Sequence, residues 1–160
     1  MKVTLGRRGD YAVRALINVA RHSPERRKAR QIVSEMDLPG RYTTQILGAL
    51  VNAGLLSAQA GPDGGYVLAR PASEITLLQV VEIAEGPVTL DQCALRGGPC
   101  DWVAECPLHE SWAGAQSAFT SRLRRTTFAD LAATDQAIEG GEVGDPLPPH
   151  LMPVERRGVR

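Results

Sequence analysis

The chain is poor in aromatic residues, with two Trp, three Tyr and two Phe among its 160 residues. Its core must therefore be built mostly from Ala, Leu and Val, which favours a small helical fold. No long apolar run is present, so the sequence contains no candidate membrane span. The first residues also lack the apolar core of a signal peptide, and we therefore expect a cytoplasmic protein.

Cysteine is equally scarce, because the chain has three and all of them lie in one short segment. They are Cys93, Cys100 and Cys106, and His109 follows three residues after the last of them. An odd, clustered set of cysteines in a cytoplasmic protein argues for metal binding or redox chemistry rather than a disulfide framework. Thiolate sulfur suits iron–sulfur clusters and zinc. Pro107 favours the first position of a helix, which would make Cys106 the N-cap and place His109 one turn away on the same side. A sulfur atom and an imidazole nitrogen could then reach one metal atom.

The formal net charge is zero, but the charges are unevenly distributed along the chain. Residues 1–70 carry eleven Lys and Arg against five Asp and Glu, whereas residues 71–160 carry seven against thirteen. A basic half joined to an acidic half indicates a module that binds a polyanion.

The amino-terminal half has the element order of a winged helix-turn-helix. Apolar residues recur at helical spacing from Gly9 to His22. The pattern then predicts a short helix near residues 32–36, a helix over 41–53, and strands at 55–56 and 66–68. The strands flank a segment rich in Gly, Pro and Asp, which is typical of a hairpin tip. We therefore predict a mainly α fold with a small β-hairpin wing, and a DNA-binding domain over residues 1–86.

The carboxy-terminal half predicts three more helices. A capping box opens a helix that ends at Gly86, a long helix runs from Pro107 to Arg125, and Thr127 caps a last short helix. The long helix carries an apolar stripe that we interpret as a dimer contact, since a small DNA-binding domain usually reads a two-fold operator as a homodimer. The alternative is that the stripe packs on its own domain. We expect the cysteine loop over residues 87–109, dimerisation helices over 110–138 and a disordered tail over 139–160.

Direct contacts with bases are expected from the amino end of the helix that follows the turn. Arg can bond guanine in a bidentate manner and Gln can bond adenine in the same way. The candidate base-reading residues are Arg41, Tyr42, Thr43, Thr44 and Gln45. Lys28 is a candidate phosphate contact. Gly64 and Gly65 would allow the wing backbone to approach the duplex closely, and their alternative role is simply to form a tight hairpin.

These segments resemble the IscR/NsrR/RirA family of winged-helix transcription regulators (the Rrf-two family). The matching segments are Arg8–Val13, Tyr42–Gln45, Gly61–Tyr66, the three-cysteine loop and Thr127–Leu131. The resemblance implies a homodimer that binds a double-stranded DNA operator, with an iron–sulfur cluster in the cysteine loop controlling operator affinity. Two features depart from the family pattern. The gap between the first two cysteines holds six residues rather than the usual five. Ala60 stands where IscR-like wings commonly carry an arginine, and we expect Gln59 to substitute for that arginine in part.

Three thiolates leave the fourth ligand open. The resemblance implies a 2Fe–2S cluster if His109 is the ligand, which we favour, and a 4Fe–4S cluster if Asp10 ligates from the partner subunit. The nearest rivals are a zinc-stabilised winged-helix repressor and a thiol switch without a cluster. The long, unequal cysteine spacing argues against zinc. An enzyme with a Cys nucleophile and His109 as base is disfavoured, because no oxyanion arrangement is recognisable.

Overall fold

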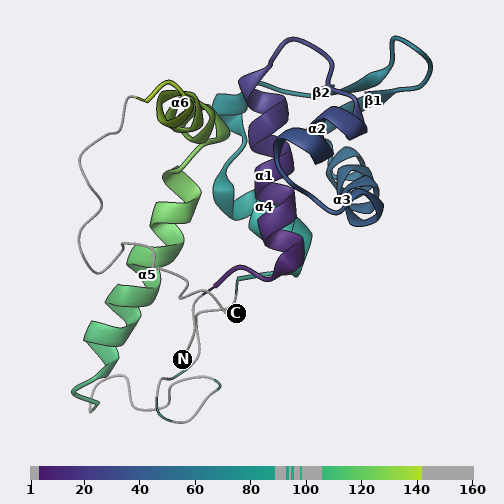
Figure 1. Cartoon of the computed structure of the whole chain (residues 1–160). Helices are drawn as coiled ribbons and strands as arrows, with labels where there is room; N and C mark the ends of the chain where they lie inside the picture. Colours follow the sequence, from purple (N-terminus) through teal and green to yellow (C-terminus); the bar gives the residue numbers. More distant parts are fainter. Residues whose placement is uncertain (1–3, 89–92, 94, 96–97, 99–105, 142–160) are drawn as a thin grey trace, which may run out of the picture.

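The computed structural model describes residues 4–88, 93, 95, 98 and 106–141 of the chain. Lys2, Cys100 and most of the expected tail lie outside the described residues. Within the described part, the elements are helices and one small antiparallel hairpin that projects at the edge of the molecule (Figure 1). The elements are α1 (Arg7–Arg21), α2 (Ala29–Glu35), α3 (Gly40–Asn52), β1 (Leu56–Gln59), β2 (Gly65–Leu68), a 3-10 turn (Ala72–Glu74), α4 (Leu77–Glu85), α5 (His109–Arg125) and α6 (Phe128–Glu139).

Helix α1 is the centre of the hydrophobic core. It packs against α3 and α4 and, on another side, against α6 (Figure 1). Its buried face includes Ala12, Ala15, Leu16 and Val19, as the helical spacing in the sequence predicts. The winged-helix fold and its mainly α character are therefore confirmed, although α1 begins at Arg7, two residues before the predicted start.

The wing is a two-stranded hairpin tied to the loop that precedes α2. Leu56 pairs with Leu68 at the base of the hairpin, and Gln59 pairs with Gly65 at its tip. The backbone of Arg27 adds a further bridge, because its N–H donates to Tyr66 O at 2.9 Å and its carbonyl accepts from Tyr66 N at 2.8 Å. The orientation of the wing is thus set partly by the segment before the helix-turn-helix.

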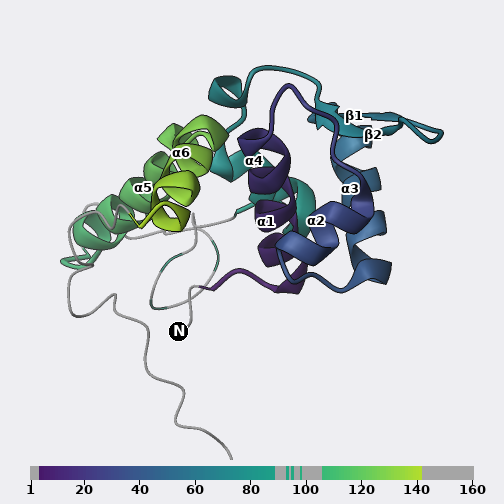
Figure 2. The same ribbon diagram turned by 45° about the horizontal axis from the view of Figure 1, so that its top comes forward.

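Helix α5 leaves the core, and α6 returns to it (Figures 1 and 2). The return is fixed by backbone bonds from Leu77 N to Thr126 O and from Phe128 N to Ile75 O, at 2.8 and 2.9 Å. Phe128 is fully buried in the same core as α1. Residues 128–138, which are expected to belong to the dimerisation helices, lie in α6, and α6 packs on α1 of its own chain with Phe128 and Ala132 buried. Their part in a dimer stays a prediction.

The start of α5 differs from the prediction. Cys106 is not the N-cap and Pro107 is not the first helical residue, since the helix begins at His109 with Leu108 before it. Residues 106–109 instead form a turn that His109 N closes by donating to Cys106 O at 3.1 Å. Proline is favoured at the second position of such a turn, which explains why Pro107 sits before the helix rather than in it.

The end of α6 also corrects the expected boundary of the tail. Glu139 is the last residue of the helix, and its carboxylate forms an ion pair with Arg21. Of the tail expected over residues 139–160, Glu139 therefore belongs to α6, and residues 142–160 lie outside the described part. Among the described residues, no helix is long and apolar enough to cross a bilayer.

Candidate DNA-binding surface and metal ligands

The amino end of α3 presents polar side chains to solvent. The helix begins at Gly40 after Pro39, and Tyr42 N and Thr43 N both donate to Pro39 O at 3.1 Å. Four of the five predicted base-reading residues are exposed, and Tyr42 has 59% of its surface accessible. The exposed four are Arg41, Tyr42, Thr44 and Gln45. Their position fits a helix end that enters a groove of DNA.

Thr43 is the exception, and its prediction as a base contact is wrong. Its residue surface is 0% exposed, and its hydroxyl donates to Pro39 O at 3.0 Å. The physical reason is helical spacing, because Thr43 lies three and four residues before Ile46 and Leu47, which are buried on the core face of α3. The same periodicity in the sequence could have identified Thr43 as a core residue.

The wing lies beside α3 and extends away from α5 and α6 (Figure 2). Gln59 is exposed near the tip of the hairpin, where it is available to DNA. A Cβ atom at Gly64 would lie 2.2 Å from Gln59 O, and one at Gly65 would lie 2.7 Å from Arg27 O. Both glycines are therefore required by the close packing of the hairpin itself, which is the alternative role considered from the sequence. Lys28 Nζ donates to Pro62 O at 2.6 Å, so that this ammonium group lies against the wing loop.

Arg27 is a residue that the sequence analysis missed. It is 7% exposed, its Nε donates to Asn18 Oδ1 at 3.3 Å, and its guanidinium pairs with Glu35. Asn18 Nδ2 donates to the other oxygen of Glu35 at 2.8 Å. The hydrogen bond from Asn18, together with the bond and charge of Arg27 and the charge of His22, outweighs partial burial and lowers the pKa of Glu35. An arginine in a polar, basic loop is usually exposed, so no local pattern indicates that this position is buried.

Two of the three candidate cysteine ligands lie in the described residues. Cys93 and Cys106 are both half-buried. Cys93 N donates to Gly98 O at 2.8 Å, which brings the backbones of these two residues together. Cys100 lies outside the described residues. No group of three or more His, Cys, Asp or Glu side chains with metal-binding geometry occurs in the described segments, which exclude this central cysteine.

The two candidates for the fourth ligand lie on different helices. His109 is half-buried at the first residue of α5, one backbone-bonded turn after Cys106. Asp10 lies in the first turn of α1, and the starts of α1 and α5 are well separated (Figure 1). The structure therefore brings His109 near Cys106 along the chain and does not bring Asp10 and His109 together within one chain.

Asp10 already has a partner. Arg14 Nη2 lies 2.9 Å from Asp10 Oδ2, and Arg14 Nη1 donates to Met36 O at 2.7 Å. This pair joins the start of α1 to the end of α2.

The beginning of α1 is also tied to the root of the cysteine loop. Gly9 N donates to Glu85 Oε1 at 3.0 Å, and Glu85 is the last residue of α4 before Gly86. A carboxylate is favourable at a helix amino terminus because the exposed N–H groups and the helix dipole are positive there. The sequence analysis did not identify Glu85, because the two residues are 76 positions apart.

Comparison with known proteins assigns the family. The family model described as Rrf2, iron-dependent transcriptional regulator, matches residues 5–134. The chain belongs to the Rrf2 family. IscR of Vibrio vulnificus is 31% identical over 140 residues, which cover 87% of this chain and 82% of that protein.

Solved structures of Rrf2 regulators show the same fold. CymR of B. subtilis, described as the global cysteine regulator, superposes with a TM-score of 0.66 at 26% identity and covers 83% of this chain and 97% of CymR. T. potens IscR superposes with a TM-score of 0.64 at 22% identity, covering 91% and 94%, a likeness of fold alone. This Rrf2 chain is therefore a DNA-binding transcriptional regulator and not an enzyme.

Proposed function

We propose that this Rrf2 chain is a homodimeric regulator whose operator affinity is controlled by an iron–sulfur cluster in the loop between α4 and α5. The observation that carries the proposal is the donor set of Cys93, Cys100, Cys106 and His109 in a chain whose family is described as iron-dependent. The similarity to IscR of Vibrio vulnificus supports the same proposal.

The described donors fit such a cluster chemically. Cys93 and Cys106 are both half-buried residues, so neither is sealed inside the core. Thiolates are the usual ligands of iron–sulfur clusters, and an imidazole can replace a thiolate. When bound, the cluster would supply an inorganic centre that changes with redox state, iron supply or nitric oxide.

His109 remains the favoured fourth ligand, with a 2Fe–2S cluster. It follows the turn that begins at Cys106, and it is the first residue of α5, so ligation would fix the start of that helix. Ligation by Asp10 of the partner subunit, with a 4Fe–4S cluster, would require Asp10 to leave Arg14. That requirement is modest, because an exposed ion pair contributes little.

Helix α5 is the proposed dimer contact. None of its described side chains is fully buried, although Trp112, Ala115, Phe119 and Leu123 recur at intervals of three and four residues. A stripe of this kind on a helix that leaves the core needs an apolar partner, and a second copy supplies one by two-fold symmetry. The two α3 helices of the dimer would then read two half-sites of the operator.

The test is native mass spectrometry with an absorption spectrum on protein purified without oxygen. A dimer with two 2Fe–2S units supports the proposal with His109 as ligand, and a mass that fits 4Fe–4S moves the ligand to Asp10. His109→Ala should change the visible spectrum, whereas Asp10→Ala and the control Ser111→Ala, in the first turn of α5, should not. Zinc alone, or no inorganic centre, would refute the cluster and leave a DNA-binding Rrf2 regulator.

A thiol switch is the second candidate, and the similarity to CymR favours it. S. aureus CymR has been solved in an oxidized form, with 26% identity to this chain and a TM-score of 0.62. In that case the metal-free protein would change its operator affinity after treatment with peroxide, and replacing Cys106 by Ser would abolish the change. An anaerobic cluster spectrum together with no peroxide effect on the metal-free form would exclude this candidate.

A further inference from the structure

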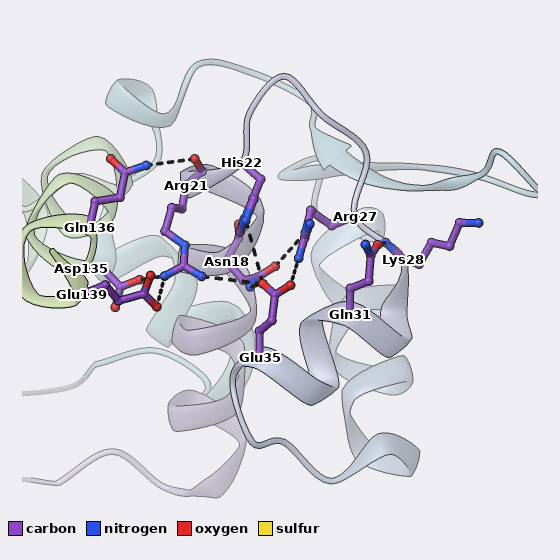
Figure 3. Close-up of polar contacts among 10 residues, drawn as sticks. All are labelled: Asn18, Arg21, His22, Arg27, Lys28, Gln31, Glu35, Asp135, Gln136 and Glu139. Carbon is purple, nitrogen blue, oxygen red and sulfur yellow. Dashed lines mark hydrogen bonds and ion pairs between the residues drawn. The ribbon is translucent and has the colours of Figure 1, made fainter.

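A chain of polar contacts runs from α6 to Arg27 in the loop before α2 (Figure 3), and the backbone of Arg27 continues it to the wing. Arg21, at the end of α1, is its first member. Arg21 Nη1 lies 2.9 Å from Asp135 Oδ2 and also pairs with Glu139, both on α6. Its Nη2 lies 3.7 Å from Glu35 Oε2 on α2, and its side chain is 9% exposed. Burial lowers the pKa of Arg21, but the bond and charge of Glu139 and the charges of Asp135 and Glu35 outweigh it and raise the pKa.

Glu35 carries the chain of contacts onward to the wing. Its second oxygen binds Arg27, and Arg27 exchanges two backbone hydrogen bonds with Tyr66 of β2. Gln136 of α6 adds a parallel contact, because its Nε2 donates to Arg21 O at 3.2 Å. Side chains from α6, α1 and α2 thus connect to the backbone of the wing through one set of charges, in which the side chains of Arg21 and Arg27 are nearly buried.

The distances from Arg21 to the carboxylates around it indicate how α6 affects the contact between Glu35 and Arg27. Arg21 approaches the α6 carboxylates more closely than it approaches Glu35, which lies at 3.7 Å. Glu35 is therefore left mainly to Arg27 and Asn18. If the α6 charges were removed, Arg21 would keep a single carboxylate nearby and would compete with Arg27 for it.

Helix α6 is also closely connected to α5. Only Thr126 and Thr127 separate the two helices, and the bonds around Thr126 and Phe128 hold this junction against the start of α4. A displacement of α5 should therefore also displace α6, because the connection between the two helices is short.

We propose that Asp135 and Glu139 are positioning residues for the DNA-binding wing, acting through Arg21, Glu35 and Arg27. The two α6 carboxylates hold the guanidinium of Arg21 against α6. Glu35 therefore stays paired with Arg27, and Arg27 in turn fixes the root of the wing. Transmission from a cluster-dependent movement of α5 rests on the proposed function above, whereas the link from α6 to the wing does not.

The experiment compares Asp135→Asn/Glu139→Gln with the wild-type protein by hydrogen–deuterium exchange of the metal-free chain. The control is Glu25→Gln/Glu74→Gln, which removes the same number of negative charges from exposed positions outside the chain of contacts. We expect exchange in the wing segment 60–68 to rise roughly three- to tenfold in the α6 variant, as for couplings between separated sites. Operator affinity, measured at one salt concentration, should fall by a similar factor, and the control should change neither quantity.

Wing exchange equal to that of the control would overturn the inference. A uniform rise over all segments in both the double variant and the single variant Asp135→Asn would overturn it as well, because that result would show general destabilisation rather than a specific link. A single variant, Asp135→Asn, keeps Glu139 on Arg21 and should give a smaller rise in the same segment, so that a folding defect in the double variant does not decide the question. Failure of the proposed cluster would leave these measurements unaffected, since they use the metal-free protein.

Discussion

Replacing Glu35 by Gln should lower the free energy of unfolding and remove part of the dependence of this free energy on pH in the acid range. Glu35 accepts a hydrogen bond from Asn18 Nδ2 at 2.8 Å and pairs with Arg27, which is nearly buried. A hydrogen bond to a charged group contributes about 1.5–3 kcal/mol, and a buried charge that loses its partner is costly. Gln keeps an acceptor for Asn18 but no charge opposite Arg27, and the Glu35 side chain is 37% exposed, so solvent screens part of the effect. We therefore expect a loss of about 1–2 kcal/mol at neutral pH.

The pH dependence of this loss has a definite sign. The pKa of Glu35 is lowered in the folded protein, first by the hydrogen bond from Asn18 and then by Arg27. The stabilisation is therefore complete above the pKa of the unfolded chain and disappears as pH falls through the lower, folded pKa. The difference between wild type and Glu35→Gln should be constant near neutral pH and shrink below about pH 4.

Urea unfolding followed by circular dichroism measures both quantities. Glu74→Gln, at an exposed position before α4, is the matched control and should change the free energy of unfolding by less than about 0.5 kcal/mol. A Glu35→Gln variant as stable as this control would refute the reasoning. A loss of stability that remained the same in acid would refute it too, because the charge of Glu35 would then not be its cause.

Three further results are expected. Phe128→Ala should lower the free energy of unfolding by about 3–5 kcal/mol because the ring is fully buried. The control is Ile138→Ala, at a residue that is 63% exposed on the same helix, and it should change this free energy little. Similar losses for the two variants in urea unfolding would contradict the packing of α6 on α1. Gly64→Ala should weaken operator binding by distorting the hairpin, since the new Cβ would lie 2.2 Å from a carbonyl oxygen of the opposite side of the turn, and unchanged affinity at fixed salt would show that the wing tolerates the change. Arg41→Ala should change the difference in binding free energy among operator variants by about 1–3 kcal/mol. Thr43→Ala should reduce stability without altering that difference, because Thr43 is buried. A changed preference among operators in the Thr43 variant would contradict its burial.

The order of the elements followed from the sequence because it depends on local patterns. The apolar face of α1, the capping boxes at Thr76 and Thr127, and the turn-forming residues of the wing each reflect interactions within a few residues of the chain. The same kind of reasoning identified the exposed amino end of α3. It failed at Thr43, which was grouped with its exposed neighbours although its spacing to Ile46 and Leu47 places it on the core face of α3.

In the cysteine loop, the sequence indicates the kind of site but does not predict where α5 begins. The composition of the loop indicated a metal or redox site, because thiol chemistry depends on residue type. The start of α5 was placed two residues too early, because proline suits both a turn and a first helical position, and the backbone bond from His109 to Cys106 decided between them.

By itself, the sequence determined the winged-helix order of the elements. It also named the candidate metal ligands and DNA contacts, which stay predictions apart from Thr43, which is buried. Only the tertiary structure decided which residues connect helices that are far apart in the sequence. Glu85 binds the first turn of α1 across 76 residues, and Arg21 meets Asp135 across 114. Such contacts leave no local pattern, since each charged residue looks like any other exposed charge until folding excludes water and brings its partner within hydrogen-bonding distance.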